Sequence, residues 1–203
     1  MLHSGMDQVD YDGTRLGERL RKARVRSELS LRALAARVGM SPSGLSQIEN
    51  GKAQPSVATL HALATELNVS LDELLTGGKS RRGGATGQRA EHPVVRRQHR
   101  RALELATGVR WESLTTGPDR LMDFLHVTYE PGASSLAQGK LVRFTGRQYG
   151  LLLFGRLEVT VGEETFELGP GDSISFDSTD AHVVRNTSRR EAKAVWIFVR
   201  RDP

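Results

Sequence analysis

The first 75 residues carry apolar side chains at intervals of three and four positions, which is the spacing of one face of an α-helix. Serines that can cap a helix precede several of these stripes, at Ser30, Ser41 and Ser56, and the pair Ser70 and Glu73 has the spacing of a capping box. The pattern predicts a compact all-α domain of five short helices. The four clearest stripes are Leu16, Leu20 and Ala23; Leu31, Leu34, Ala35 and Val38; Leu45 and Ile48; and Leu60, Leu63, Ala64 and Leu67.

Beyond residue 93 the apolar positions fall in short runs rich in Val, Leu, Phe and Tyr, separated by turn residues such as Gly169-Pro170-Gly171. Many short strands at this spacing are typical of a β-sandwich or a β-barrel. We expect strands at residues 94–97, 101–105, 110–114, 122–129, 149–154, 156–161, 164–168, 172–176, 181–186 and 192–199.

The stretch between these two patterns, TGGKSRRGGATGQRAEHP, contains five glycines and four basic residues and almost nothing apolar. Such a composition is typical of a flexible linker. The chain is therefore predicted to be a multidomain α + β protein. We expect a disordered arm at residues 1–13, a helical domain at 14–75, the linker at 76–93 and a β domain at 94–203.

The 203-residue chain has no cysteine, which excludes disulfides, thiolate zinc sites and thiol redox chemistry. Its first ten residues lack the apolar stretch of a signal peptide, and no apolar run is long enough to cross a membrane. We expect a cytoplasmic protein without a membrane partner. The net charge is +5, and six basic residues with one acid lie between Arg15 and Arg26. That run indicates either a solvated helix face or a surface that faces phosphates.

The segment LRALAARVGMSPSGLSQIENGK (residues 31–52) is predicted to form two short helices joined by a turn. Units of this shape place their second helix in the major groove of DNA. On that helix Gln47 can pair with adenine through two hydrogen bonds, and the backbone N–H groups that follow Ser41 suit a phosphate. A module that binds other proteins through its helices is the alternative.

Residues 15–75 also resemble the lambda-repressor and Cro-like (XRE) helix-turn-helix family, most specifically in LSQIENGKAQPSVATLHALATELNVSLDELL. The resemblance implies base contacts from residues at the start of the second helix, phosphate contacts from Asn50 and Lys52, and an ion pair between Arg24 and Glu49 that fixes the fold. The predicted DNA-binding set is Arg32, Ser41, Pro42, Ser43, Gly44, Ser46, Gln47, Asn50 and Lys52.

Residues 94–200 resemble the cupin family, which implies a closed β-barrel of the jelly-roll type. In LEVTVGEETFELGPGDSISFDSTDAHVVRN the residues Gly171, His182 and Asn186 stand at the family's spacing, whereas Asp177 and Thr179 replace its usual proline and glycine. The segments EPGASS and GLLLFGRLEV match the flanks of the family's first motif.

Metal-binding cupins take three histidines and a glutamate, but the resemblance places Gln148 at the glutamate position and no histidine at either first-motif position. Those positions fall on Val142 and Phe144, or on Leu141 and Arg143. His182 is the one family ligand that remains, and a divalent transition metal needs about three or four protein ligands. We therefore expect no metal and no other cofactor.

Two interpretations of His182 stay open: an interior histidine whose bonds are satisfied, or part of a pocket for a small ligand at the barrel mouth. An arginine at that mouth would favour an anionic ligand such as a carboxylate. The predicted lining residues are His126, Arg143, Gln148, Tyr149, His182 and Trp196.

The two resemblances together imply a bacterial transcriptional regulator that is located at the nucleoid when it binds DNA. We expect a repressor that binds a near-palindromic double-stranded operator as a homodimer formed by the cupin domain, which also senses an unknown small-molecule effector. The alternatives are a metal-dependent cupin enzyme tethered to DNA, and a constitutive regulator whose cupin domain only dimerises.

Overall fold

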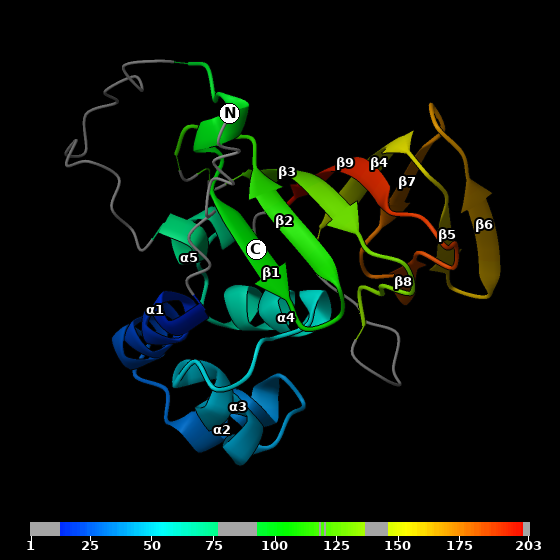
Figure 1. The fold of residues 1–203 in the computed structure, drawn as a ribbon. Coiled ribbons are helices and arrows are strands. Elements are labelled where there is room, and N and C mark those ends of the chain that lie inside the picture. The colour runs from blue at the N-terminus through cyan, green and yellow to red at the C-terminus, as the bar shows by residue number, and fades with distance from the viewer. Residues whose placement is uncertain (1–12, 77–92, 118, 120, 137–145, 201–203) are drawn as a thin grey trace, which may run out of the picture.

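The computed structural model describes residues 13–117, 119, 121–136 and 146–200, except for 77–92. The predicted arm therefore lies outside the described residues apart from Gly13, and the predicted linker apart from Thr76 and Pro93. The helices are α1 (Gly13–Arg26), α2 (Leu31–Arg37), α3 (Pro42–Glu49), α4 (Val57–Glu66) and the shorter α5 (Leu71–Thr76). Figure 1 shows them gathered below and beside the strands.

Each of the four predicted caps is confirmed. The hydroxyl oxygens of Ser30, Ser41 and Ser56 each accept a hydrogen bond of 3.1 Å from the backbone N–H three residues later. The hydroxyl of Ser70 accepts the N–H of Glu73 at 2.8 Å. These bonds satisfy backbone donors that the first turn of a helix leaves without a partner, and they fix where α2 to α5 begin.

Helix α1 crosses α3 at very short range, and Gly17 is the residue that allows it. A Cβ atom at this position would lie 2.4 Å from the carbonyl oxygen of Ile48 and 2.5 Å from that of Glu49. Only a residue without a side chain permits this approach. Around the crossing, the side chains of Leu20 and Leu45 are fully buried.

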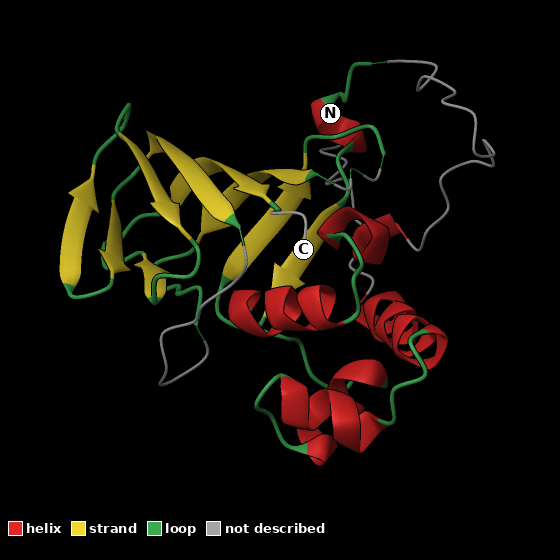
Figure 2. Cartoon of the chain, turned by 180° about the vertical axis from the view of Figure 1, so that it is seen from behind, coloured by secondary structure: helices red, strands yellow, loops and turns green. Residues whose placement is uncertain are grey.

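The β domain consists of two antiparallel sheets, shown in yellow in Figure 2. One sheet has the order β1-β2-β3-β9-β4-β7, and the other has the order β6-β5-β8. The strands are β1 (Ala102–Leu105), β2 (Val109–Ser113), β3 (Met122–Tyr129), β4 (Arg147–Phe154), β5 (Leu157–Val161), β6 (Glu164–Leu168), β7 (Ser173–Asp177), β8 (His182–Arg185) and β9 (Ala192–Val199).

One predicted strand is wrong. Residues 94–96 have no regular structure, and a single 3₁₀ turn follows at Arg97–His99. The segment offers only Val94 and Val95 as apolar side chains, and Val94 is 55% exposed. A strand needs a continuous buried face to be stabilised, and this stretch of basic and polar residues has none.

Asn186, which stands at the cupin spacing, holds the turn after β8 against the end of β3. Its side-chain amide donates hydrogen bonds to the carbonyls of Tyr129 at 3.0 Å and Arg190 at 2.7 Å. The residue is 1% exposed. Its role in this structure is therefore structural.

Helix α4 packs against both domains. Leu60, Leu63 and Leu67 are buried, and the N–H of Ala58 donates to the carbonyl of Ser135 in the β domain at 3.2 Å. A second backbone bond of 3.1 Å runs from Ala106 to the carbonyl of Pro55, just before the helix. Figure 1 shows α4 between the other helices and the first strands. Buried apolar side chains of both domains consequently form one continuous cluster.

In the part of the chain that the structure describes, no helix is long and apolar enough to cross a lipid bilayer.

Candidate functional site

Helix α3 has one buried face and one exposed polar face. Leu45 and Ile48 are buried in the helical domain, while Ser43 and Gln47 are exposed. All nine predicted DNA-binding residues lie in the described part of the chain, and only Gly44 and Ser46 among them are partly buried. The exposed face therefore offers hydroxyl, amide and ammonium groups to a partner in solution.

The ends of α3 are well ordered by local bonds. The hydroxyls of Ser41 and Ser43 are 3.2 Å apart at the helix start. At the other end the side-chain amide of Asn50 donates to the carbonyl of Ser46 at 2.8 Å and to its hydroxyl at 3.3 Å. A phosphate contact from the Asn50 amide, as the resemblance implies, requires one of these bonds to open.

The expected ion pair between Arg24 and Glu49 is present and joins α1 to the last turn of α3. Nε and one terminal nitrogen of Arg24 donate to the two carboxylate oxygens at 2.7 and 2.9 Å. The side chains are 12% and 4% exposed. The hydrogen bond to Glu49 raises the pKa of Arg24 above its usual value. A bidentate pair in this setting fixes the orientation of α3 relative to α1.

The basic run on α1 is partly used within the protein. Arg19 donates to the carbonyl of Leu74 at 2.9 Å, and Arg26 lies 3.1 Å from the carboxylate of Glu73. These contacts attach α5 to α1. The run thus includes residues with a structural role as well as exposed cations such as Arg21.

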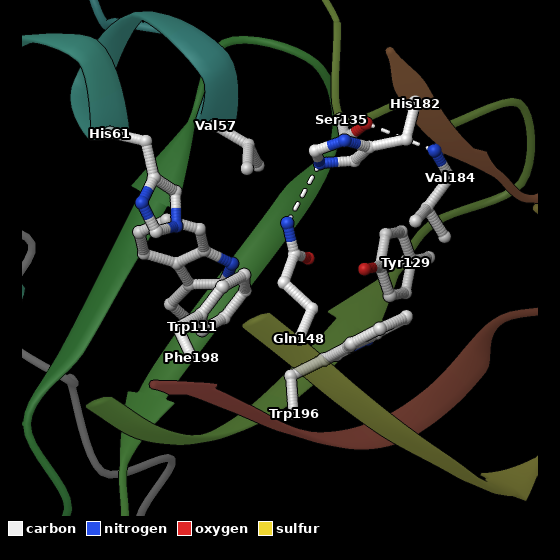
Figure 3. Close-up of a pocket in the computed structure, with 10 residues that line it drawn as sticks. All are labelled: Val57, His61, Trp111, Tyr129, Ser135, Gln148, His182, Val184, Trp196 and Phe198. Carbon is white, nitrogen blue, oxygen red and sulfur yellow. Dashed lines mark hydrogen bonds between the residues drawn. The ribbon is translucent and has the colours of Figure 1, made fainter. Parts of the chain in front are cut away.

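A cavity lies in the β domain at the side where α4 packs (Figure 3). Its walls are mostly aromatic, and its polar groups come from several strands. The side chains that shape it most are those of Trp111, Tyr129, Gln148, His182, Trp196 and Phe198.

A hydrogen-bonded pair forms the polar centre of this cavity. Nδ1 of His182 donates to the carbonyl of Asp180 at 2.8 Å, since a carbonyl can only accept. Nε2 is then left to accept a hydrogen bond from the Gln148 amide nitrogen, at 2.7 Å. Burial lowers the pKa of His182, so the ring is uncharged at neutral pH. The cavity centre is therefore polar but neutral.

Three of the predicted lining residues border this cavity, and two others do not. Gln148, His182 and Trp196 line the cavity. His126 instead lies on the opposite face of β3, with Nδ1 2.9 Å from the carboxylate of Glu112.

Tyr149 lies on the outer face of β4 and is 44% exposed. In β3 and in β4 the residues on either side of His126 and Tyr149 are the buried ones, because successive side chains of a strand point to opposite faces. Arg143 lies outside the described residues.

Several lining residues escaped the sequence reasoning. Trp111 in β2 and Tyr129 in β3 lie at buried positions of strands in which buried and partly exposed residues alternate. This period of two in the sequence could have identified them. Val57 and His61 come from α4, and nothing in the spacing of that helix places them on a β domain.

The residues at the cupin metal position do not fit a metal ion. Gln148 provides an uncharged amide where the family has a carboxylate, and that amide hydrogen-bonds the nitrogen that His182 would use as a ligand. Within the described residues, no group of three or more His, Asp or Glu side chains is arranged to hold an ion. Metal-dependent cupin chemistry would need about three or four ligands at this place.

Comparison with known proteins agrees with this two-part architecture. The helix-turn-helix family matches residues 20–74, and the cupin domain family matches residues 125–198. HTH-type transcriptional regulator PuuR of Escherichia coli (strain K12) is 26% identical over 179 residues, which cover 87% of this chain and 90% of PuuR. HTH-type transcriptional regulator SutR of the same organism is 25% identical over 176 residues, covering 84% and 86%.

The same architecture occurs in a solved structure. An HTH_3 family transcriptional regulator from Vibrio cholerae superposes with a TM-score of 0.67 over 94% of this chain and 97% of its own, at 20% identity. At this identity the likeness establishes the fold alone.

A helix-turn-helix domain followed by a cupin domain defines a class of HTH-type transcriptional regulators. This chain has that architecture, with an XRE-type helix-turn-helix domain followed by a cupin domain, and it is similar to these HTH-type transcriptional regulators.

Proposed function

We propose that the protein is a sequence-specific repressor that reads double-stranded DNA with the exposed face of α3. The observation that carries the proposal is the division of α3 into a buried face with Leu45 and Ile48 and an exposed face with Ser43 and Gln47. Short polar side chains there allow a close approach to base edges, and Lys52 can neutralise a phosphate. The protein acts by binding and not as an enzyme, and its place in the cell is on DNA in the cytoplasm.

We propose further that two copies pair through the outer face of the six-stranded sheet. On β4 the outward side chains of Tyr149, Leu151 and Leu153 are 44%, 41% and 47% exposed. Phe154 continues this apolar stripe at 43%, and the guanidinium of Arg190 lies 5.9 Å from its ring centre. A contiguous exposed apolar patch with a polar rim is typical of a protein interface. We call these four β4 residues the outer stripe.

Pairing of the cupin domains would present two copies of α3 to one duplex. Dimeric helix-turn-helix proteins bind half-sites separated by about 10–10.5 base pairs or a multiple of that. The operator is therefore proposed to be a near-palindrome. The two sheets are proposed to close into a barrel whose cavity receives a small-molecule effector. The predicted contact between Arg143 and an anionic effector falls outside the described part of the chain.

The central experiment selects duplexes from a random-sequence pool with the wild-type protein and measures the affinity of variants for the selected sequence. Gln47→Ala should cost about 1–3 kcal/mol on that duplex and relax the preference at one position. Gln98→Ala, an exposed residue near the β domain, is the matched control and should bind like wild type. Unchanged preference in the Gln47 variant would exclude Gln47 as a base reader.

A further inference from the structure

Helix α4 closes the cavity of the β domain with two of its own side chains. Val57 and His61 are one helical turn apart and project from the same side of α4 into the cavity (Figure 3). Both residues are 8% exposed. The DNA-binding domain therefore supplies part of the wall of the site in which the cupin domain is proposed to hold its effector.

The His61 ring lies between aromatic side chains of the β domain, in a position that a bound aromatic ligand could take. Its centre lies 5.4 Å from that of Trp111 in an edge-to-face arrangement and 4.6 Å from that of Phe198. Burial, with smaller contributions from His182 and Arg200, lowers the pKa of His61 to about 3. The ring is thus an uncharged heteroaromatic group between aromatic walls at neutral pH, a favourable arrangement for two rings.

The cavity has no room for an effector while α4 stays in place. The free volume among the lining side chains is about 20 Å³. That is space for about one water molecule, far below the volume of a site for a metabolite. A molecule of several heavy atoms needs more room than this, and Val57 and His61 are the lining side chains that come from the other domain.

The described lining also defines the chemistry of a molecule that could replace them. It carries no carboxylate, guanidinium or ammonium group, so the described wall leaves an ionic ligand without a counter-charge. It offers aromatic faces from Trp111 and Trp196, together with the neutral polar groups of Gln148 and Tyr129. A small, planar, uncharged ring with a hydrogen-bonding nitrogen matches these groups.

We propose that helix α4 and the effector compete for this cavity, and that the effector is a small uncharged heteroaromatic molecule that takes the place of the His61 ring. This inference rests on the proposed function, because it presupposes that the cupin domain binds an effector. Docked α4 fixes the orientation of α3 relative to the cupin dimer. Displacement by the effector frees the DNA-binding domains and removes the preorganisation that favours two half-sites at once.

The first experiment uses the two tryptophans as reporters, since the chain contains only Trp111 and Trp196 and both line the cavity. Each is 1% exposed, so acrylamide should quench their fluorescence poorly in the wild-type protein. In His61→Ala the quenching constant should rise about threefold. Imidazole, added at pH 8 where it is mostly uncharged, should return it toward the wild-type value in a saturable way.

Matched variants separate the ring from general damage to the fold. His99→Ala, at an exposed position, should behave like wild type with and without imidazole. His61→Phe keeps the packed ring and should keep the tryptophans protected. If His61→Ala does not fold, Val57→Ala takes its place, and imidazole should then produce a saturable change in fluorescence. Protected tryptophans in His61→Ala, or exposure that imidazole does not reverse, would overturn the proposal.

The second experiment tests the coupling to DNA with a reversible clamp. The backbones of Pro55 and Ala106 are joined by a 3.1 Å hydrogen bond across the contact between the two domains, so cysteines are introduced at these two positions of a chain that has no cysteine of its own. His61→Ala should bind the pool-selected duplex about tenfold more weakly than wild type. In the Pro55→Cys, Ala106→Cys background, oxidation should restore that affinity, and so should imidazole under reducing conditions.

Failure of this inference and failure of the proposed function give different results in these experiments. If His61→Ala exposes the tryptophans but binds DNA like wild type, the competition does not regulate DNA binding and the inference fails. If the wild-type protein selects no sequence from the pool, it is the proposed function that fails.

Discussion

Helices α3 and α4 belong to one small domain, yet their polar side chains have opposite surroundings. On α3 the amide of Gln47 is exposed, and the helix is held by one buried face and an ion pair at its end. On α4 the imidazole of His61 is 8% exposed and lies between two aromatic rings of the other domain. An exposed polar face can bind a partner without disturbing the fold, whereas a buried one can do so only by moving the helix. The proposed function accordingly assigns DNA reading to α3 and the response to an effector to α4.

The largest effect should come from breaking the attachment of α3. Arg24→Ala leaves the carboxylate of Glu49 buried without its guanidinium, which should cost about 3–5 kcal/mol in the free energy of unfolding. Urea denaturation followed by circular dichroism measures it, with Arg21→Ala on the exposed side of α1 as the control. The double variant Arg24→Met, Glu49→Leu should recover most of the loss. A cost below about 1 kcal/mol for the single variant would mean that packing alone holds α3.

The crossing of α1 over α3 gives the next effect. Gly17→Ala places a Cβ atom 2.4 Å from the carbonyl oxygen of Ile48, and this backbone oxygen cannot rotate away as a side chain can. We expect a loss of about 1–3 kcal/mol, although alanine favours a helix more than glycine does. Gly117→Ala, where an added Cβ meets nothing within 4 Å, should be neutral. A neutral or stabilising Gly17 variant would show that the two helices can separate without cost.

The attachment of α4 should be sensitive to pH. Because burial lowers the pKa of His61 to about 3, the unfolded chain takes up the proton more readily between that value and about 6.5. Stability from this group is complete above about pH 6.5 and is lost as the pH falls, by about 2 kcal/mol between pH 7 and pH 5. His61→Phe should flatten this dependence in urea denaturation. A smaller dependence of stability on pH should remain in His61→Phe, because burial also lowers the pKa of His182. If His61→Phe has the same pH dependence as wild type, His61 is exposed to solvent in the folded protein.

The same contrast explains what could be predicted from the sequence. The caps at Ser41 and Ser56 are hydrogen bonds to the backbone N–H three residues later, and α3 is defined by apolar residues at helical spacing. Both features are local in the sequence, so both could be predicted from it. The lining was missed at His126 and Tyr149 because an error of one residue in a strand reverses which face a side chain occupies. His61 was out of reach, since its neighbours Leu60 and Leu63 already account for a helix stripe. The second buried face of α4 depends on a domain that begins some 30 residues later.

The smallest effect concerns the outer stripe of β4, which resembles α3 in being exposed but is apolar. Leu153→Ser should leave the free energy of unfolding of one copy nearly unchanged, because the side chain is 47% exposed. It should raise the dimer dissociation constant about tenfold, since a two-fold interface carries each substitution twice. Phe166→Ser is a matched control, because Phe166 is 42% exposed on the other sheet. Sedimentation measures the dimer, and binding to a full operator should weaken while binding to one half-site does not. A monomeric wild-type protein with full operator affinity would contradict pairing through β4 and leave α3 to read each half-site alone.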